Sequence, residues 1–388
     1  MFGLIRLLVL TVVFASFIEA KSWLGSHHNS TTKSDIAIFL TVTRSPPPGD
    51  GQWLQALLHV TRLYNPATTI FVFLNKRTFS EDPNFIDQLA SLRVQVRVTD
   101  TYRWKDSPMA RLRQSLPDLF SGEEFMDRFC AYAAAATTEG VKRILAVDGD
   151  MALFAKAEDI VAPYDEDIVS ACHHTSQMLI VNSVDALSKY CNFISSYYTQ
   201  DLSVLQNNAV LVGKRKDEYK DLHDMELLNL FLLQSPHVSR HILCPEAPNQ
   251  PRCDAKYSGC ITSPQVQAVE SLFKLGHDPA NGDFIACSSW ASFTSLIGWV
   301  PNGRGLPVPY HKATGDCLPV IHFQGPCKKL VPAFVMQLRN MLQGLMSARK
   351  AGVGRQGAAI GRFRGPLLRP GFDRQEGKGW GCRWAGKV

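Results

Sequence analysis

Strand-like and helix-like segments alternate along the first half of this chain. Apolar runs predict buried strands at 35–42, 69–74, 94–98 and 144–147. Between these runs, apolar residues recur at helical spacing in 52–64, 85–92 and 123–139, and Gly140 ends the last of these helices. Strands that alternate with helices of this length predict an α/β fold with a mostly parallel sheet covered on both faces.

The pattern becomes less regular after the strand at 144–147. Short strands are predicted at Leu179–Val181 and Ala209–Val212, and a helix at Met225–Leu233. Residues 244–318 are rich in Cys, Pro and Gly, so we expect loops that lie over the sheet and are tied by disulfides. The candidate cysteines are Cys244, Cys253, Cys260, Cys287, Cys317 and Cys327, and their pairing cannot be deduced from the sequence. A zinc site is disfavoured because paired C-x-x-C spacing is missing.

The N-terminus predicts entry into the secretory pathway. Arg6 precedes an apolar run at 7–18, which is the length of a signal-peptide core and short for a membrane span. Residues 1–20 are therefore predicted to be a signal peptide, with a short membrane anchor as the alternative. Residues 21–34 are predicted to be a stem, with an N-glycosylation acceptor at Asn29-Ser30-Thr31. We expect a lumenal protein of the Golgi or the ER, secreted if the segment is cleaved.

The net charge of +6 does not indicate nucleic-acid binding, because the charge is concentrated at the C-terminus. Residues 347–388 hold ten Lys or Arg against two Asp or Glu, a surplus of 8, so the remaining 346 residues carry about −2. We predict one folded domain at 35–346, followed by a basic, Gly/Arg-rich and disordered tail at 347–388. No nucleic-acid partner is expected.

Two motifs far apart in the chain carry the candidate chemistry. The strand at 144–147 ends in Asp148-Gly149-Asp150, and His322 and Lys328 follow about 170 residues later. In open α/β sheets ligands bind beyond the carboxyl ends of the strands, where these carboxylates are expected. Two carboxylates suit Mg²⁺ or Mn²⁺, and one imidazole shifts the preference toward Mn²⁺. Lys328 adds a positive charge for a phosphate, so the motifs predict a metal–diphosphate site.

These motifs resemble those of a GT-A glycosyltransferase, with its Rossmann-like fold, and most closely the family-8 group that contains glycogenin and bacterial galactosyltransferases. The resemblance covers roughly residues 35–330. Asp148-Gly149-Asp150 matches the family's Asp-x-Asp, and the segment from His322 to Lys328 matches its His-x-x-Gly-x-x-Lys. The segments at 207–212 and 224–229 resemble its Phe-Asn-Ala-Gly-Val and Asp-Gln-Asp-x-x-Asn segments, and Arg128 resembles a donor-contacting arginine.

The resemblance implies a role for each matched residue. Asp148, Asp150 and His322 would hold the metal. The donor, a nucleotide sugar with UDP as its nucleotide, would be contacted by Arg128, Lys328, Gly325 and Asp100, the last after the third strand. Asp224 would lie near the acceptor or the sugar hydroxyls, and Asn208 would hydrogen-bond the donor sugar.

The chain departs from the family pattern at several places. The glycine after Asn-Ala is missing, Lys329-Leu330 replaces Pro-Trp, and Met225 stands where the family has a glutamine near the reacting sugar. Retention at the anomeric carbon is favoured over inversion. The acceptor is expected to be a glycan or glycoprotein.

Two other classes of function remain open. One is a catalytically inactive, carbohydrate-binding protein that keeps the fold. The other is a nucleotide-sugar phosphohydrolase or pyrophosphorylase, which the N-terminal segment disfavours because that chemistry is expected in the cytosol.

Overall fold

A computed structural model describes most of the predicted folded domain. The described residues are 35–42, 50–74, 87, 89–98, 128–172, 175–197, 199–220, 222, 224–242, 289–302, 304–312, 318–323 and 325–350. Among them, no helix combines the length and apolarity that a membrane crossing requires. The predicted signal segment, stem, Asp100 and most of the predicted tail lie outside the described residues.

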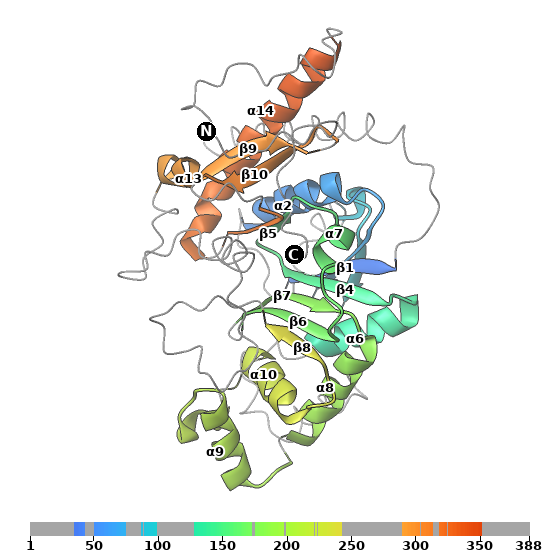
Figure 1. The fold of residues 1–388 in the computed structure, drawn as a ribbon, viewed down its shortest axis with the longest axis vertical. Helices are drawn as coiled ribbons and strands as arrows, with labels where there is room; N and C mark the ends of the chain where they lie inside the picture. Colours follow the sequence, from blue (N-terminus) through green and yellow to red (C-terminus); the bar gives the residue numbers. More distant parts are fainter. Residues whose placement is uncertain are drawn as a thin grey trace.

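A seven-stranded sheet in the order β3-β2-β1-β4-β7-β6-β8 forms the centre of the fold (Figure 1). Its strands are β1 (Ile36–Val42), β2 (Thr69–Leu74), β3 (Gln95–Val98), β4 (Arg143–Asp148), β6 (Ile168–Cys172), β7 (Thr175–Val181) and β8 (Arg240–Ile242). β7 runs antiparallel to both of its neighbours, whereas the other pairings are parallel. The predicted α/β fold with a mostly parallel sheet is confirmed.

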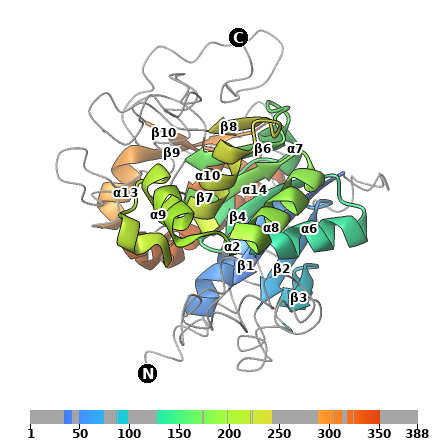
Figure 2. The same cartoon turned by 90° about the horizontal axis from the view of Figure 1, so that it is seen from below.

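Helices cover both faces of this sheet (Figures 1 and 2). They are α2 (Asp50–Tyr64), α6 (Arg128–Glu139), α7 (Ala157–Val161), α8 (Val184–Tyr197), α9 (Leu202–Leu211) and α10 (Asp224–Gln234). Side chains of α6, α8 and α10 pack on one face, and side chains of α2 and α7 pack on the other. Strand residues alternate between the two cores, as Phe39 and Leu40 of β1 do, because successive side chains of a strand point to opposite faces.

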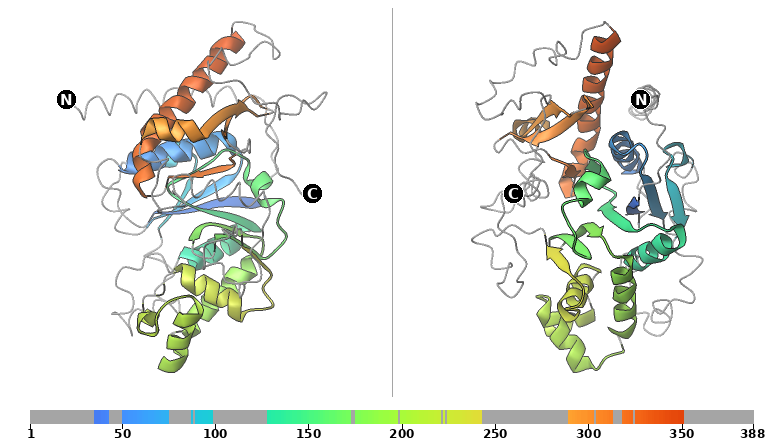
Figure 3. Two further views of the ribbon diagram at one scale, coloured as in Figure 1. Left: turned by 60° about the vertical axis from the view of Figure 1, so that its left-hand side comes forward. Right: turned by 45° about the vertical axis from the view of Figure 1, so that its right-hand side comes forward.

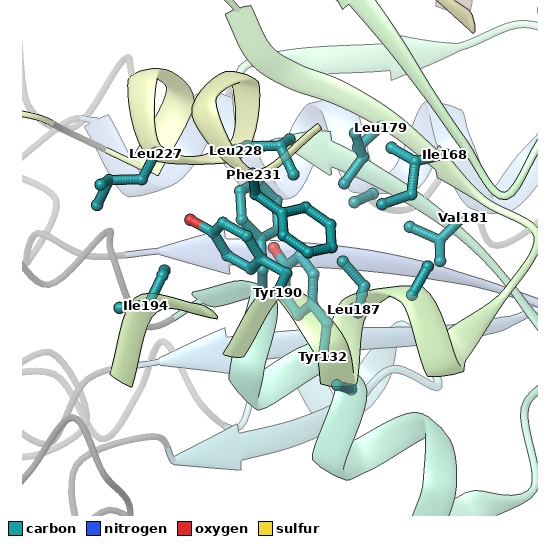
Figure 4. Close-up of a cluster of buried hydrophobic side chains, with 14 of the residues drawn as sticks. Tyr132, Ile168, Leu179, Val181, Leu187, Tyr190, Ile194, Leu227, Leu228 and Phe231 are labelled. Carbon is teal, nitrogen blue, oxygen red and sulfur yellow. The ribbon is translucent and has the colours of Figure 1, made fainter. Parts of the chain in front are cut away.

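Aromatic residues fill the core beneath α6, α8 and α10 (Figure 4). Tyr190 of α8 is fully buried, and its ring contacts Phe129 of α6 and Phe231 of α10. A disulfide between Cys130 and Cys191 also joins α6 to α8. This pair was not among the cysteines singled out in the sequence, whose side chains lie outside the described residues.

A second group of elements packs on the outer side of α2 (Figure 3). It comprises β5 (Met151–Leu153), α13 (Trp290–Leu296), β9 (Ile297–Pro301), β10 (Pro307–His311), β11 (Val320–His322), the 3₁₀ helix η5 (Gly325–Leu330) and α14 (Val331–Lys350). Phe334 of α14 is fully buried at the centre of this core, where its ring meets Phe154, Trp299 and Phe323. α2 is therefore buried between the sheet and α14.

The structure corrects two sequence predictions. The predicted strand at Ala209–Val212 is wrong, because this run forms the end of α9 and the turn after it. A short apolar run fits either structure, and here Leu205 and Ala209 are buried on one side of a helix. The loops predicted for 244–318 are wrong for Trp290–His311, which forms α13 and the antiparallel β9–β10 pair. Gly298 lies beneath the ring of Tyr310 in that pair, where a Cβ atom would collide.

Candidate metal–diphosphate site

The two aspartates lie where β4 ends and β5 begins. Four consecutive buried residues, Ile144–Val147, anchor β4 between its neighbours. Asp148 is the last residue of β4 and stands opposite Thr41 of β1. Gly149 and Asp150 form the turn into β5, and a Cβ atom at Gly149 would lie 3.1 Å from Cδ1 of Leu54 on α2. The glycine thus permits α2 to approach the turn closely.

A short strand pairing brings His322 to these carboxylates. β11 pairs antiparallel with β5, so that His322 stands opposite Met151. The backbone N–H of Phe323 also donates to the carbonyl of Asp150 at 2.9 Å. The ladder therefore fixes His322 next to Asp150 although 172 residues separate them in the chain.

Asp148, Asp150 and His322 form a compact group, called here the Asp-Asp-His cluster. One potential ligand atom from each residue can be chosen so that all three atoms lie within 4.8 Å of one another. His322 Nε2 is 3.1 Å from Asp150 Oδ1. The side chains of His322, Asp150 and Asp148 are 2%, 12% and 29% exposed, so the imidazole is buried and the carboxylates are partly accessible to solvent.

Two cations, Arg128 and Lys328, each contact one carboxylate of the cluster and are called here the flanking cations. Arg128 of α6 donates from Nη1 to Asp148 Oδ1 at 3.0 Å, and its side chain is only 7% exposed. Lys328 of η5 lies 3.2 Å from Asp150 Oδ2, and its side chain is 41% exposed. Both residues were predicted to contact the nucleotide-sugar donor, and the structure brings both to the cluster.

The two carboxyl groups respond differently to this environment. Burial raises the pKa of Asp148 to about 6, although the charge of Arg128 opposes the shift. Burial would also raise the pKa of Asp150, but His322 and Lys328 together hold it below its ordinary value. Asp148 is therefore the carboxylate whose negative charge is less well compensated by its surroundings.

The donor set of the cluster fits a divalent cation. Mg²⁺ binds oxygen ligands at about 2.0–2.1 Å, which places ligand atoms of one shell roughly 3–4 Å apart. His322 Nε2 and Asp150 Oδ1 are 3.1 Å apart, within this range, and all three chosen atoms lie within 4.8 Å of one another. Two carboxylates with one imidazole form a ligand set that suits Mn²⁺ or Mg²⁺.

The other residues predicted for the site are not seen in contact with the cluster among the described residues. Asp100 lies outside the described residues, and Gly325 is the first residue of η5. Asp224 is the first residue of α10, and its side chain is not described. Asn208 is 4% exposed and lies on α9. Its amide donates to Gln200 and accepts from Gln234, so its recorded contacts lie outside the cluster.

A pair of hydroxyl groups beside the cluster was not foreseen. Thr41 Oγ1 lies 2.6 Å from the hydroxyl oxygen of Tyr132, and Thr41 is the register partner of Asp148. Tyr132 follows Arg128 by four residues, so both lie on the same side of α6. The four-residue spacing of Arg128 and Tyr132 in the predicted helix could have indicated that Tyr132 lies near the site.

Comparisons with known proteins give only a distant likeness. No protein-family model matches the chain, and no curated protein matches it. Among solved structures, PaToxG glycosyltransferase is 8% identical with a TM-score of 0.31, over 69% of this chain and 87% of that one. Mouse xyloside xylosyltransferase 1 in its apo form is 13% identical with a TM-score of 0.33, over 58% of this chain and 94% of that one. A transferase mutant is 12% identical with a TM-score of 0.26, over 41% of this chain and 78% of that one. Likeness at this level assigns no function.

Proposed function

We propose that this protein is a metal-dependent glycosyltransferase that moves a sugar from a UDP-sugar to a glycan or glycoprotein. The observation that carries the proposal is the convergence of Asp148, Asp150 and His322, with Lys328 in contact with Asp150. These residues come from the two motifs on which the family-8 resemblance rests. The mostly parallel sheet, with the cluster at the carboxyl end of β4, is the framework in which such ligands bind.

In the proposed site, Asp148, Asp150 and His322 hold Mn²⁺ or Mg²⁺. The ion supplies Lewis-acid stabilisation of the negative charge that develops on the departing diphosphate. Lys328 contributes a further positive charge there, and Arg128 holds Asp148 in place. Because His322 is anchored by the β5–β11 ladder, its imidazole needs little reorganisation on binding.

The roles of the remaining residues belong to the same proposal. Asp224 acts near the acceptor or the sugar hydroxyls, Asn208 binds the donor sugar, and Asp100 and Gly325 contact the nucleotide. For Asn208 this role requires that its amide exchange Gln200 or Gln234 for a sugar hydroxyl. Retention at the anomeric carbon is the favoured outcome.

The secretory lumen, in the Golgi or the ER, is the proposed compartment. The disulfide between Cys130 and Cys191 supports it, because disulfides persist in oxidising compartments. Residues 1–20 would direct the chain there as a cleaved signal peptide or a short anchor.

Transfer by the full chain across a panel of nucleotide sugars tests the proposal, with Mn²⁺ and with a chelator. We expect metal-dependent release of the nucleoside diphosphate from one donor, together with a new glycoside. Asp150→Asn should abolish this turnover, whereas Asp185→Asn should keep it, since Asp185 is an exposed partner of Lys189 on α8. Turnover at the same rate in the presence of the chelator would refute the proposal. Release of sugar phosphate would point to a phosphohydrolase, and glycan binding without turnover to an inactive carbohydrate-binding protein.

A further inference from the structure

The charged side chains around the cluster balance one another. Asp148 and Asp150 carry two negative charges, and Arg128 and Lys328 carry two positive charges. Each carboxylate is in direct contact with one of the flanking cations, at 3.0 Å and 3.2 Å. The four side chains therefore sum to zero before any metal enters.

This balance makes a divalent cation alone a poor fit. A bare metal would leave two surplus positive charges next to Arg128, whose side chain is 7% exposed, and it would compete with Lys328 for Asp150. Surplus charge in a buried place is costly unless it is compensated. A metal that arrives with a diphosphate brings the compensating negative charge with it.

We propose that Lys328 is an exchangeable partner of Asp150, which couples metal binding to nucleotide binding. The inference rests on the proposed function and deepens it. Without ligands, Lys328 neutralises Asp150. When metal and diphosphate bind, the ammonium would leave Asp150 for a diphosphate oxygen, and the freed carboxylate would be available as a metal ligand. Metal and nucleotide then strengthen each other's binding by the same factor.

Lys328 is suited to this exchange and Arg128 is not. The Lys328 side chain is 41% exposed, and an ammonium on a flexible four-carbon stem can move to a new partner. Arg128 is buried, and its guanidinium lies 4.9 Å from the ring centroid of Phe129. We therefore expect Arg128 to keep Asp148 in both states.

Calorimetric titration of the full chain tests this coupling, with Mn²⁺ alone, with UDP alone, and with Mn²⁺ in saturating UDP. For the unmodified protein we expect UDP to tighten Mn²⁺ binding by about tenfold or more. In Lys328→Met, Mn²⁺ alone should bind on the order of tenfold tighter, because a positive charge has been removed beside the ion. UDP should then give a much smaller gain.

Two further variants serve as controls. Lys328→Arg keeps the charge and should restore weak binding of Mn²⁺ alone. Lys329→Met removes the exposed neighbouring charge and should behave like the unmodified protein. The inference is overturned if Lys328→Met weakens the binding of Mn²⁺ alone or leaves it unchanged while the unmodified protein binds Mn²⁺ and UDP together. A folded, unmodified protein that binds neither ligand would overturn the proposed function as well.

Discussion

Two regions of this protein use polar side chains in different ways. At the end of β4, the Asp-Asp-His cluster and the flanking cations gather four charged groups and an imidazole in a partly enclosed place. Around α9 and α10, the neutral amides of Gln200, Asn208 and Gln234 bind one another in a chain. Amides can satisfy one another fully, whereas carboxylates that are paired with cations can exchange those partners for the charges of a ligand. The first region therefore has the stronger claim to chemistry.

The two regions are also held by different cores. The core around α14 supports β5 and β11, and with them His322, whereas the core beneath α8 and α10 supports the amide chain. Variants in one core or the other therefore test whether the two regions behave independently.

The largest effect is expected for Phe334→Ala. Phe334 is fully buried among the rings of Phe154, Trp299 and Phe323, so its truncation should cost about 3–5 kcal/mol of unfolding free energy. Urea unfolding would measure the loss. Met336→Ala, on the exposed side of the same helix, should cost little and serves as the control. Equal effects of the two variants would contradict the described packing of α14.

The next effect concerns the disulfide between α6 and α8. Replacing Cys130 and Cys191 by alanine opens a link across 61 residues and should lower stability by about 2–4 kcal/mol. Reducing the unmodified protein should lower its melting temperature to a similar degree, while the double variant should be insensitive to reductant. An unmodified protein whose melting temperature is unaffected by complete reduction would contradict the prediction.

The sequence predicted the first region better than the second for a physical reason. β1, β2 and β4 have long apolar runs, and the match to two motifs placed Asp148, Asp150 and His322 together. The β5–β11 ladder that joins them involves only three residue pairs, too short to recognise in the sequence. The apolar run before Val212 fits a strand as well as a helix, and only its packing on the core decides between them.

A smaller effect is expected from pH. Since burial raises the pKa of Asp148 from 3.8 to about 6, the metal-free protein favours the neutral carboxyl below about pH 6 and loses that contribution as the pH rises through this value. Metal binding requires the ionised form. Mn²⁺ affinity should therefore fall by about tenfold for each pH unit below 6. Titration between pH 5 and 8 checks this, and an affinity that is constant across the range would contradict it.

The smallest effect is expected for Asn208→Ala, which tests whether the amide chain contributes to metal binding at the cluster. Loss of the amide leaves Gln200 and Gln234 without one partner and should cost about 1 kcal/mol of stability. Mn²⁺ affinity should stay within about twofold, because the amide of Asn208 contacts Gln200 and Gln234 and is not one of the proposed metal ligands. Asn207→Ala, at the exposed neighbouring position, is the matched control. A large loss of Mn²⁺ affinity in Asn208→Ala, but not in Asn207→Ala, would contradict this prediction and show that the two regions act as one site.

The most direct test of the central claim is to locate Mn²⁺ by anomalous diffraction in crystals grown with Mn²⁺ and UDP. The account predicts an anomalous peak bounded by a carboxylate oxygen of Asp148, a carboxylate oxygen of Asp150 and a ring nitrogen of His322, with Lys328 turned toward the diphosphate. A peak elsewhere, or none while Asp150 keeps its contacts with His322 and Lys328, would contradict it.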